Sequence, residues 1–142
     1  MTVINNHAFR PVLHPVHGVL LAGTFILFLS GLLSDLAYAS SYQIQWTNFA
    51  SWLHAGGLLC GSFVLLWSIV NLIRISHRSK LHVAYTVLLL ATWLLGFFNS
   101  LIHAKDVWAI MPTAIILSVI VVLLSCVSIW LGFSRFGIGG EK

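Results

Sequence analysis

Charged side chains are scarce in this sequence, and acidic ones are the scarcest. Asp, Glu, Lys and Arg make up 7% of the 142 residues, with three acidic and seven basic side chains, whereas 59% of the residues are hydrophobic. A soluble domain of this size could not stay in solution with that balance, so the sequence predicts an integral membrane protein. Three carboxylates also leave little material for hydrolysis, and the sequence has neither a phosphate-binding loop nor a Gly-x-Ser-x-Gly motif.

Cysteine is nearly absent as well. The two cysteines, Cys60 and Cys126, both fall inside long apolar runs. A thiol in such surroundings usually packs as a small apolar side chain. We therefore interpret both as packing residues.

Long apolar runs are what the sequence has in abundance. A helix needs about 20 predominantly apolar residues to cross a bilayer, and four runs meet this condition, at roughly 16–39, 49–73, 81–103 and 113–133. They account for nearly the whole chain, so we expect residues 1–142 to form a single four-span domain. The connections between them are too short for anything but neighbouring antiparallel helices. The sequence therefore predicts an all-α integral membrane protein, an antiparallel four-helix bundle.

The basic residues lie in the expected loops and tails rather than along one helix face, so they do not indicate nucleic acid as a partner. Lys105, beside Asp106, is the one basic residue on its side of the predicted membrane. The others share the opposite side; they are Arg10, Arg74, Arg78, Lys80, Arg135 and Lys142. The positive-inside rule therefore predicts that both termini are cytoplasmic. The expected location is the bacterial inner membrane.

Small and polar residues recur at helical spacing in each run. Lipid-facing positions tolerate polar atoms poorly, so each such seam is expected to face the other helices of a left-handed bundle. The seams are His17, Leu21, Thr24, Phe28, Gly31, Asp35 and Tyr38 in the first span; His54, Gly57, Gly61, Val64, Ser68 and Asn71 in the second; His82, Tyr85, Leu89, Thr92, Gly96, Asn99 and His103 in the third; and Ser118, Val121, Ser125, Ser128, Gly132 and Arg135 in the fourth.

Four histidines on these seams sort into two pairs by depth. With both termini inside, His17 and His82 share the cytoplasmic half of the membrane, and His54 and His103 share the outer half. His82 and His103 lie about 30 Å apart at 1.5 Å per residue, so one site cannot hold both. The sequence therefore predicts two sites or none.

Imidazoles from facing helices of a bundle commonly hold a b-type haem. His54 and His103 are candidate ligands of an outer haem iron, and His17 and His82 of an inner one. Asp35, level with the outer pair, could orient a ligand imidazole or bind another metal itself. Glycines on the seams would leave room for a flat macrocycle; they are Gly57, Gly61 and Gly96. The alternative role of the four histidines and Asp35 is structural hydrogen bonding.

Several stretches resemble the bacterial predicted membrane protein family known as domain of unknown function 2231. The stretches are HPVHGVLLAG, LLSDLAY followed by WLHAGGLLCG, VNLIRI, the His82 that opens the third span, and the ending SIWLGFSRFGIGG. The resemblance implies a four-helix membrane bundle. Family members also occur beside or fused to periplasmic dehydrogenase and c-type cytochrome domains, which implies redox partners.

The match to the family pattern can be followed residue by residue. The matching positions are His14, Pro15, Asp35, His82, Gly132 and the tail at 137–139. Asn71 stands where the resemblance implies an aspartate, and His54 and His103 stand where it implies aliphatic or basic residues. Two additional histidines at one depth are what an added cofactor site would look like.

The leading hypothesis is a haem b electron-transfer subunit that moves electrons between quinol and a membrane or periplasmic redox partner. Quinone would be its second bound cofactor. This hypothesis makes the chain an electron carrier rather than a stand-alone enzyme. The alternative is a cofactor-free accessory or assembly subunit of a larger complex or a homo-oligomer. A third hypothesis is a proton or metal-ion path; its residues would be Asp35, His54, His103, His82 and His17.

Overall fold

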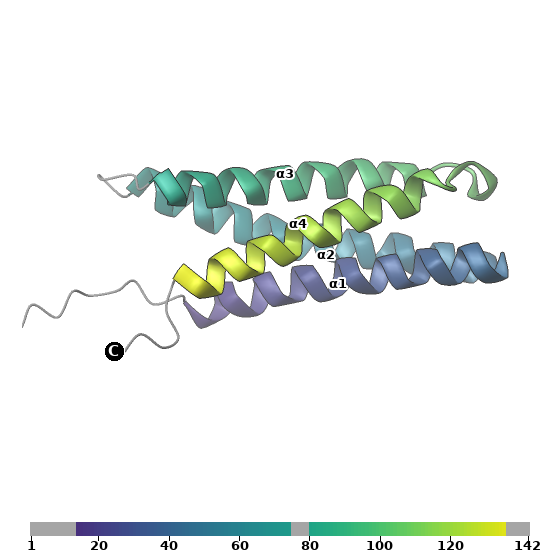
Figure 1. Cartoon of the computed structure of the whole chain (residues 1–142), viewed down its shortest axis with the longest axis horizontal. Helices are drawn as coiled ribbons and strands as arrows, with labels where there is room; N and C mark the ends of the chain where they lie inside the picture. The colour runs from purple at the N-terminus through teal and green to yellow at the C-terminus, as the bar shows by residue number, and fades with distance from the viewer. Residues whose placement is uncertain (1–13, 75–79, 136–142) are drawn as a thin grey trace, which may run out of the picture.

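The computed structural model describes residues 14–74 and 80–135, which form four long α-helices (Figure 1). They are α1 (Pro15–Ser41), α2 (Ile44–Arg74), α3 (Lys80–His103) and α4 (Thr113–Arg135), with a short 3-10 helix, η1 (Val107–Ala109), before α4. Each long helix has the length and composition to cross a membrane. The predicted all-helical, four-span bundle is therefore confirmed. Some positions used for the sequence predictions lie outside the described residues; they are Arg10, Arg78, Lys142 and the tail at 137–139.

The start of α2 differs from the prediction, because the helix begins at Ile44 rather than at Phe49. The additional turn carries the polar side chains of Gln45, Thr47 and Asn48. A search for apolar runs omits such a turn, although its backbone is helical. The extension matters for the site because it places hydroxyl and amide groups beside the end of α3.

Local sequence explains where α1 begins and ends. The imidazole Nδ1 of His14 accepts a hydrogen bond from the backbone N–H of Val16 at 3.3 Å, and Pro15 occupies the first helical turn, where a missing N–H costs nothing. At the other end, Tyr42 adopts a left-handed conformation with φ of 55° and donates its N–H to the carbonyl of Tyr38 at 2.7 Å. This tight turn sends α2 back along α1.

The helices form a four-membered ring in which α1 packs against α2 and α4, and α3 packs against the same two helices. Figure 1 shows α4 crossing obliquely between α1 and α3 on one face of the bundle, with α2 crossing behind them. Arg74 and Lys80 lie at the end where α1 starts, which we call the basic end. Connections 42–43 and 104–112 lie at the other end, which we call the distal end. The cytoplasmic placement of the basic end stays a prediction from the charges.

The polar seams do face the interior. Most seam residues whose side chains the structure describes are buried, and those that are partly exposed are Gly61, Asn71 and His82; the side chain of Arg135 lies outside the described part. Large apolar side chains point outward instead, as lipid contact requires; examples are Val19, Leu33, Leu59, Leu123 and Trp130. The bundle therefore has its polar groups inside and its apolar groups outside, which fits a multi-pass membrane protein.

One hydroxyl pair gives a test of this packing. Thr86 donates its proton to the carbonyl of His82 at 3.0 Å, so Ser68 must donate to Thr86 Oγ1 across the α2–α3 contact, at 2.7 Å. We expect Ser68→Ala to lower the free energy of unfolding by about 0.6 kcal/mol, the usual value of such a bond in a membrane protein. Titration with denaturing detergent measures it, with Ser134→Ala at an exposed position as the control. Equal effects of the two substitutions would contradict the assignment.

Candidate metal centre

All four helices contribute polar side chains to one point near the distal end. We call this group the polar cluster; it consists of Asp35 from α1, His54 from α2, Asn99 and His103 from α3, and Ser118 from α4. Asn99 and His103 are four residues apart and so lie on the same face of α3. All cluster residues are 0% exposed except His103, which is 7% exposed. An ionisable group buried this deeply in a membrane bundle needs close partners.

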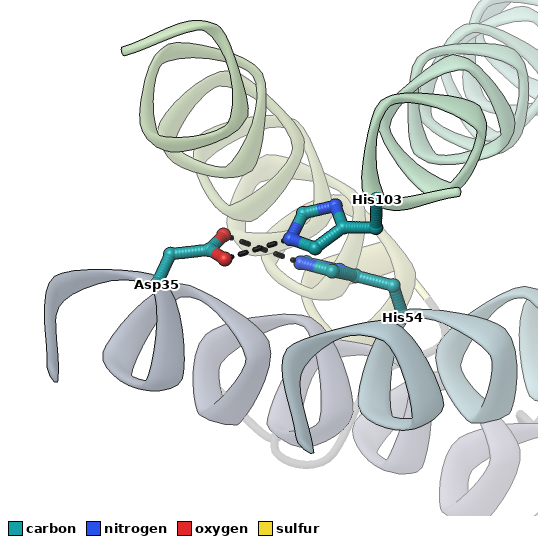
Figure 2. A group of neighbouring side chains, drawn as sticks. All are labelled: Asp35, His54 and His103. Carbon is teal, nitrogen blue, oxygen red and sulfur yellow. Dashed lines mark hydrogen bonds and ion pairs between the residues drawn. The ribbon is translucent and has the colours of Figure 1, made fainter. Parts of the chain in front are cut away.

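The Asp35 carboxylate is the centre of the cluster, and Figure 2 shows both imidazoles directed toward it. Its Oδ1 lies 2.7 Å from Nε2 of His103. Its Oδ2 accepts a hydrogen bond from Ser118 Oγ at 2.5 Å and lies 3.5 Å from Nε2 of His54. The carboxylate therefore interacts with side chains from each of the other three helices.

Hydrogen-bond geometry fixes the tautomer of His103. Its Nδ1 lies 2.9 Å from the carbonyl oxygen of Asn99. A carbonyl only accepts, so Nδ1 must carry a proton. Nε2 then faces the Asp35 carboxylate at 2.7 Å, and two acceptors cannot lie so close without a positive group between them. A proton fits this hydrogen-bond distance, and a metal ion could replace it once the two atoms move farther apart.

His54 sits in a slot that glycine provides. A Cβ atom at Gly31 would lie 2.6 Å from Cε1 of His54, which is closer than atoms can pack. Nε2 of His54 lies 3.2 Å from both Asn99 Nδ2 and Ser118 Oγ. Its Nδ1 is buried and has no hydrogen-bond partner among the described residues. The slot thus directs one nitrogen of His54 at the carboxylate and leaves the other unpaired.

The donor set, two imidazoles and a carboxylate, suits a transition-metal ion. One ligand atom from each of Asp35, His54 and His103 lies within 4.8 Å of the others. An ion about 2.1 Å from each ligand, at angles between tetrahedral and octahedral, would hold them about 3.0–3.4 Å apart, so these side chains must shift to bind one. The Nδ1–H···O=C bond of His103 and the Ser118–carboxylate bond are the outer interactions that normally orient such ligands.

The predicted ligand residues divide between the two ends of the bundle. The outer pair, His54 and His103, comes together with Asp35 at the distal end. At the basic end, His17 Nε2 lies 3.2 Å from the hydroxyl of Tyr85, and His82 Nε2 is buried without a hydrogen-bond partner among the described residues. Within residues 14–74 and 80–135, only the distal group places three side chains of metal-binding type together. Haem ligation by either pair stays a prediction.

Two of the three glycines expected to leave room for a macrocycle, Gly57 and Gly96, pack against an aromatic ring. A Cβ atom at Gly57 would lie 2.8 Å from the Phe28 ring, and one at Gly96 would lie 3.0 Å from it. Phe28 is almost fully buried, and its ring centroid is 6.0 Å from that of His54. The space that these two glycines open is therefore filled by an aromatic side chain beside the polar cluster.

Sequence reasoning placed Asn99 and Ser118 on the seams but did not assign them to the site. A signal for them was present. In an antiparallel bundle, depth can be counted from the ends of adjacent spans, and this count brings Asn99 and Ser118 to the level of Asp35 and His54. One polar seam residue from every helix at one depth indicates a site more strongly than a histidine pair alone.

The chain belongs to the DUF2231 family of predicted membrane proteins, whose profile matches residues 13–137. This match confirms the resemblance drawn from the sequence motifs, and the matched range contains the whole polar cluster. No curated protein and no solved structure matches the chain.

Proposed function

We propose that the protein is a membrane-embedded metal-binding protein that holds one divalent transition-metal ion between Asp35, His54 and His103. The observation that carries the proposal is a carboxylate facing two imidazole Nε2 atoms, at 2.7 and 3.5 Å, inside a bundle. Two imidazoles and a carboxylate form the ligand set of many zinc and non-haem iron sites. Three protein ligands also leave positions on the ion for a further small ligand.

Charge balance favours an ion at this point. Asp35 is the acidic member of the cluster, and its other members are uncharged or, for the histidines, positively charged when protonated. A carboxylate with no exposed surface requires a compensating positive charge close by. A divalent ion bound to both imidazoles supplies that charge and removes the need for a shared proton.

The same geometry favours an ion over a haem. Axial ligands approach haem iron from opposite faces of the macrocycle, but here both Nε2 atoms point at one carboxylate. The ring centroids of His54 and His103 are 4.8 Å apart, and Phe28 packs beside His54. The helices would have to separate to admit a macrocycle. The haem b electron-transfer subunit, with its quinol and redox partner in the bacterial inner membrane, stays a prediction that absorption spectroscopy tests.

Metal analysis of the purified protein tests the proposal. We expect close to one equivalent of zinc or iron per chain in mild detergent, measured by mass spectrometry, and loss of most of it in His54→Ala and His103→Ala. His17→Ala is the matched control, because it removes a buried histidine of the same bundle that lies outside the polar cluster. Helical content by circular dichroism shows that each variant is folded.

The outcomes separate the hypotheses. A wild-type protein that takes up neither Zn²⁺, Fe²⁺ nor Mn²⁺ on titration contradicts the proposal and favours the accessory subunit. An α band that sharpens on reduction, and that His54→Ala abolishes, identifies haem instead. If metal stays bound in both His54→Ala and His103→Ala but is lost from His17→Ala, the metal site lies at the basic end instead.

A further inference from the structure

A recess whose lining residues are mostly polar opens at the distal end, between the start of α2 and the end of α3. Its volume is about 260 Å³, and its lining includes Gln45, Thr47, Asn48, Ser51 and His103. His103 is the one member of the polar cluster that lines this recess; its small exposed surface belongs to the backbone, because its side chain is fully buried. The recess therefore ends at the residue whose imidazole faces Asp35.

We propose that this recess admits and briefly holds the hydrated divalent cation that the polar cluster then binds, an inference that rests on the proposed function. Six water molecules at about 30 Å³ each occupy about 180 Å³, so an ion with its first hydration shell fits a recess of about 260 Å³. The polar lining side chains are amides, hydroxyls and one imidazole, which can bond to coordinated water without repelling a cation.

Thr47 marks the inner wall of the route. It is 5% exposed, and its Oγ1 has no hydrogen-bond partner among the described residues. Thr47 and His54 are seven residues apart, so both lie on one face of α2, about 10 Å along the helix axis. A hydroxyl with free hydrogen-bonding capacity next to the recess can take over a water ligand as the ion loses its hydration shell at His103.

Apolar side chains close two other sides of the polar cluster. Toward the α1–α4 side of the distal end, Tyr38, Ile110 and Ala114 form a buried apolar cluster. Toward the middle of the bundle, Phe28 separates the polar cluster from a cavity of only about 10 Å³, the size of one water at most. In the proposed route the ion therefore enters and leaves at the distal end.

The polar groups below Phe28 support this one-sided route. Thr24, Thr92 and Ser128 each donate a hydrogen bond to a carbonyl of their own helix, at 2.8 Å in every case. Their protons point at the backbone and not along a chain of neighbours. The polar seams thus continue through the middle of the bundle, but these three hydroxyl groups do not form a hydrogen-bonded path along it.

Blocking the recess tests the inference. In purified full-length protein loaded with Zn²⁺, we expect Ser51→Trp to slow metal removal by excess chelator about tenfold and metal uptake by the same factor, so that the equilibrium affinity hardly changes. Ala55→Trp is the matched control, because Ala55 is exposed one turn further along α2 and does not line the recess. This variant should exchange metal at the wild-type rate.

A second variant covers the case in which Ser51→Trp misfolds. Thr47→Val keeps the side-chain shape and removes the unpaired hydroxyl, so it should slow uptake while leaving the protein folded. Equal exchange rates in wild type, Ser51→Trp and Thr47→Val would overturn the inference while leaving the proposed metal site intact. Absence of Zn²⁺ binding at equilibrium in the wild type would instead overturn the proposed function and the route with it.

Discussion

Asp35→Asn should abolish tight metal binding while leaving the four-helix bundle assembled. Asparagine has nearly the shape of aspartate but no negative charge, and its amide oxygen is a poor ligand for a zinc or iron ion. Loss of an outer hydrogen bond to a metal ligand typically costs 10–100-fold in affinity, so loss of this ligand should cost about 100-fold or more. Titration with Zn²⁺ against a competing chelator measures the change.

The metal-free form of this variant should be much less affected. The introduced amide can donate a hydrogen bond to Nε2 of a neutral His103 and accept one from Ser118, so the expected loss in unfolding free energy is about 1–2 kcal/mol. Asp106→Asn is the control for removal of negative charge at the distal end, because Asp106 is exposed and belongs to neither the polar cluster nor the recess lining. Unchanged Zn²⁺ affinity in Asp35→Asn would exclude the carboxylate as a ligand.

Gly31→Ala should disrupt the site although residue 31 carries no metal ligand. The new methyl group would lie 2.6 Å from Cε1 and 2.8 Å from Nε2 of His54, so the imidazole must swing away from Asp35. Overpacking of this kind costs about 1–3 kcal/mol, which exceeds the gain of about 1 kcal/mol that alanine brings to a helix interior. We expect a lower free energy of unfolding and a Zn²⁺ affinity reduced about 10–100-fold.

Gly23→Ala is a matched control on the same helix. A Cβ atom at residue 23 would meet only Cys60 Sγ, at 3.9 Å, which is an ordinary contact. The helix-propensity gain then acts alone, so this variant should be equal to the wild type in Zn²⁺ affinity and up to about 1 kcal/mol more stable. If Gly31→Ala lowers the free energy of unfolding and Gly23→Ala raises it, the effect lies at the His54 slot. If both substitutions raise the free energy of unfolding, the imidazole is free to move away from the new methyl group.

The architecture could be read from the sequence because a bilayer permits few solutions. Four apolar runs with short connections leave little choice but an antiparallel bundle. Seam residues such as His17, Thr92 and Ser128 are buried as predicted, since polar atoms gain hydrogen bonds inside and lose them in lipid. The start of α2 was placed too late because hydropathy reports only how apolar the side chains are. At a membrane surface, a turn with polar side chains can still form the backbone hydrogen bonds of a helix.

The candidate site could be predicted only in part. The depth of His54 and His103, and Asp35 beside them, followed from helix rise and chain direction. The direction in which each ring points depends on close packing, such as the slot at Gly31, and no periodic pattern encodes that. The use of Gly57 and Gly96 by Phe28 was missed for the same reason, because a small residue indicates an adjacent large group without identifying it.

The division of the polar cluster between two helical hairpins bears on how the protein is made. The first hairpin, α1 with α2, carries Asp35 and His54, and the second, α3 with α4, carries His103 and Ser118. Each hairpin can insert into the bilayer as a unit, yet neither holds a complete ligand set. On the proposed function, the ion binds only after the two halves have docked and then holds them together, so supply of the ion during biogenesis would set how much of the newly inserted chain reaches its final tertiary state.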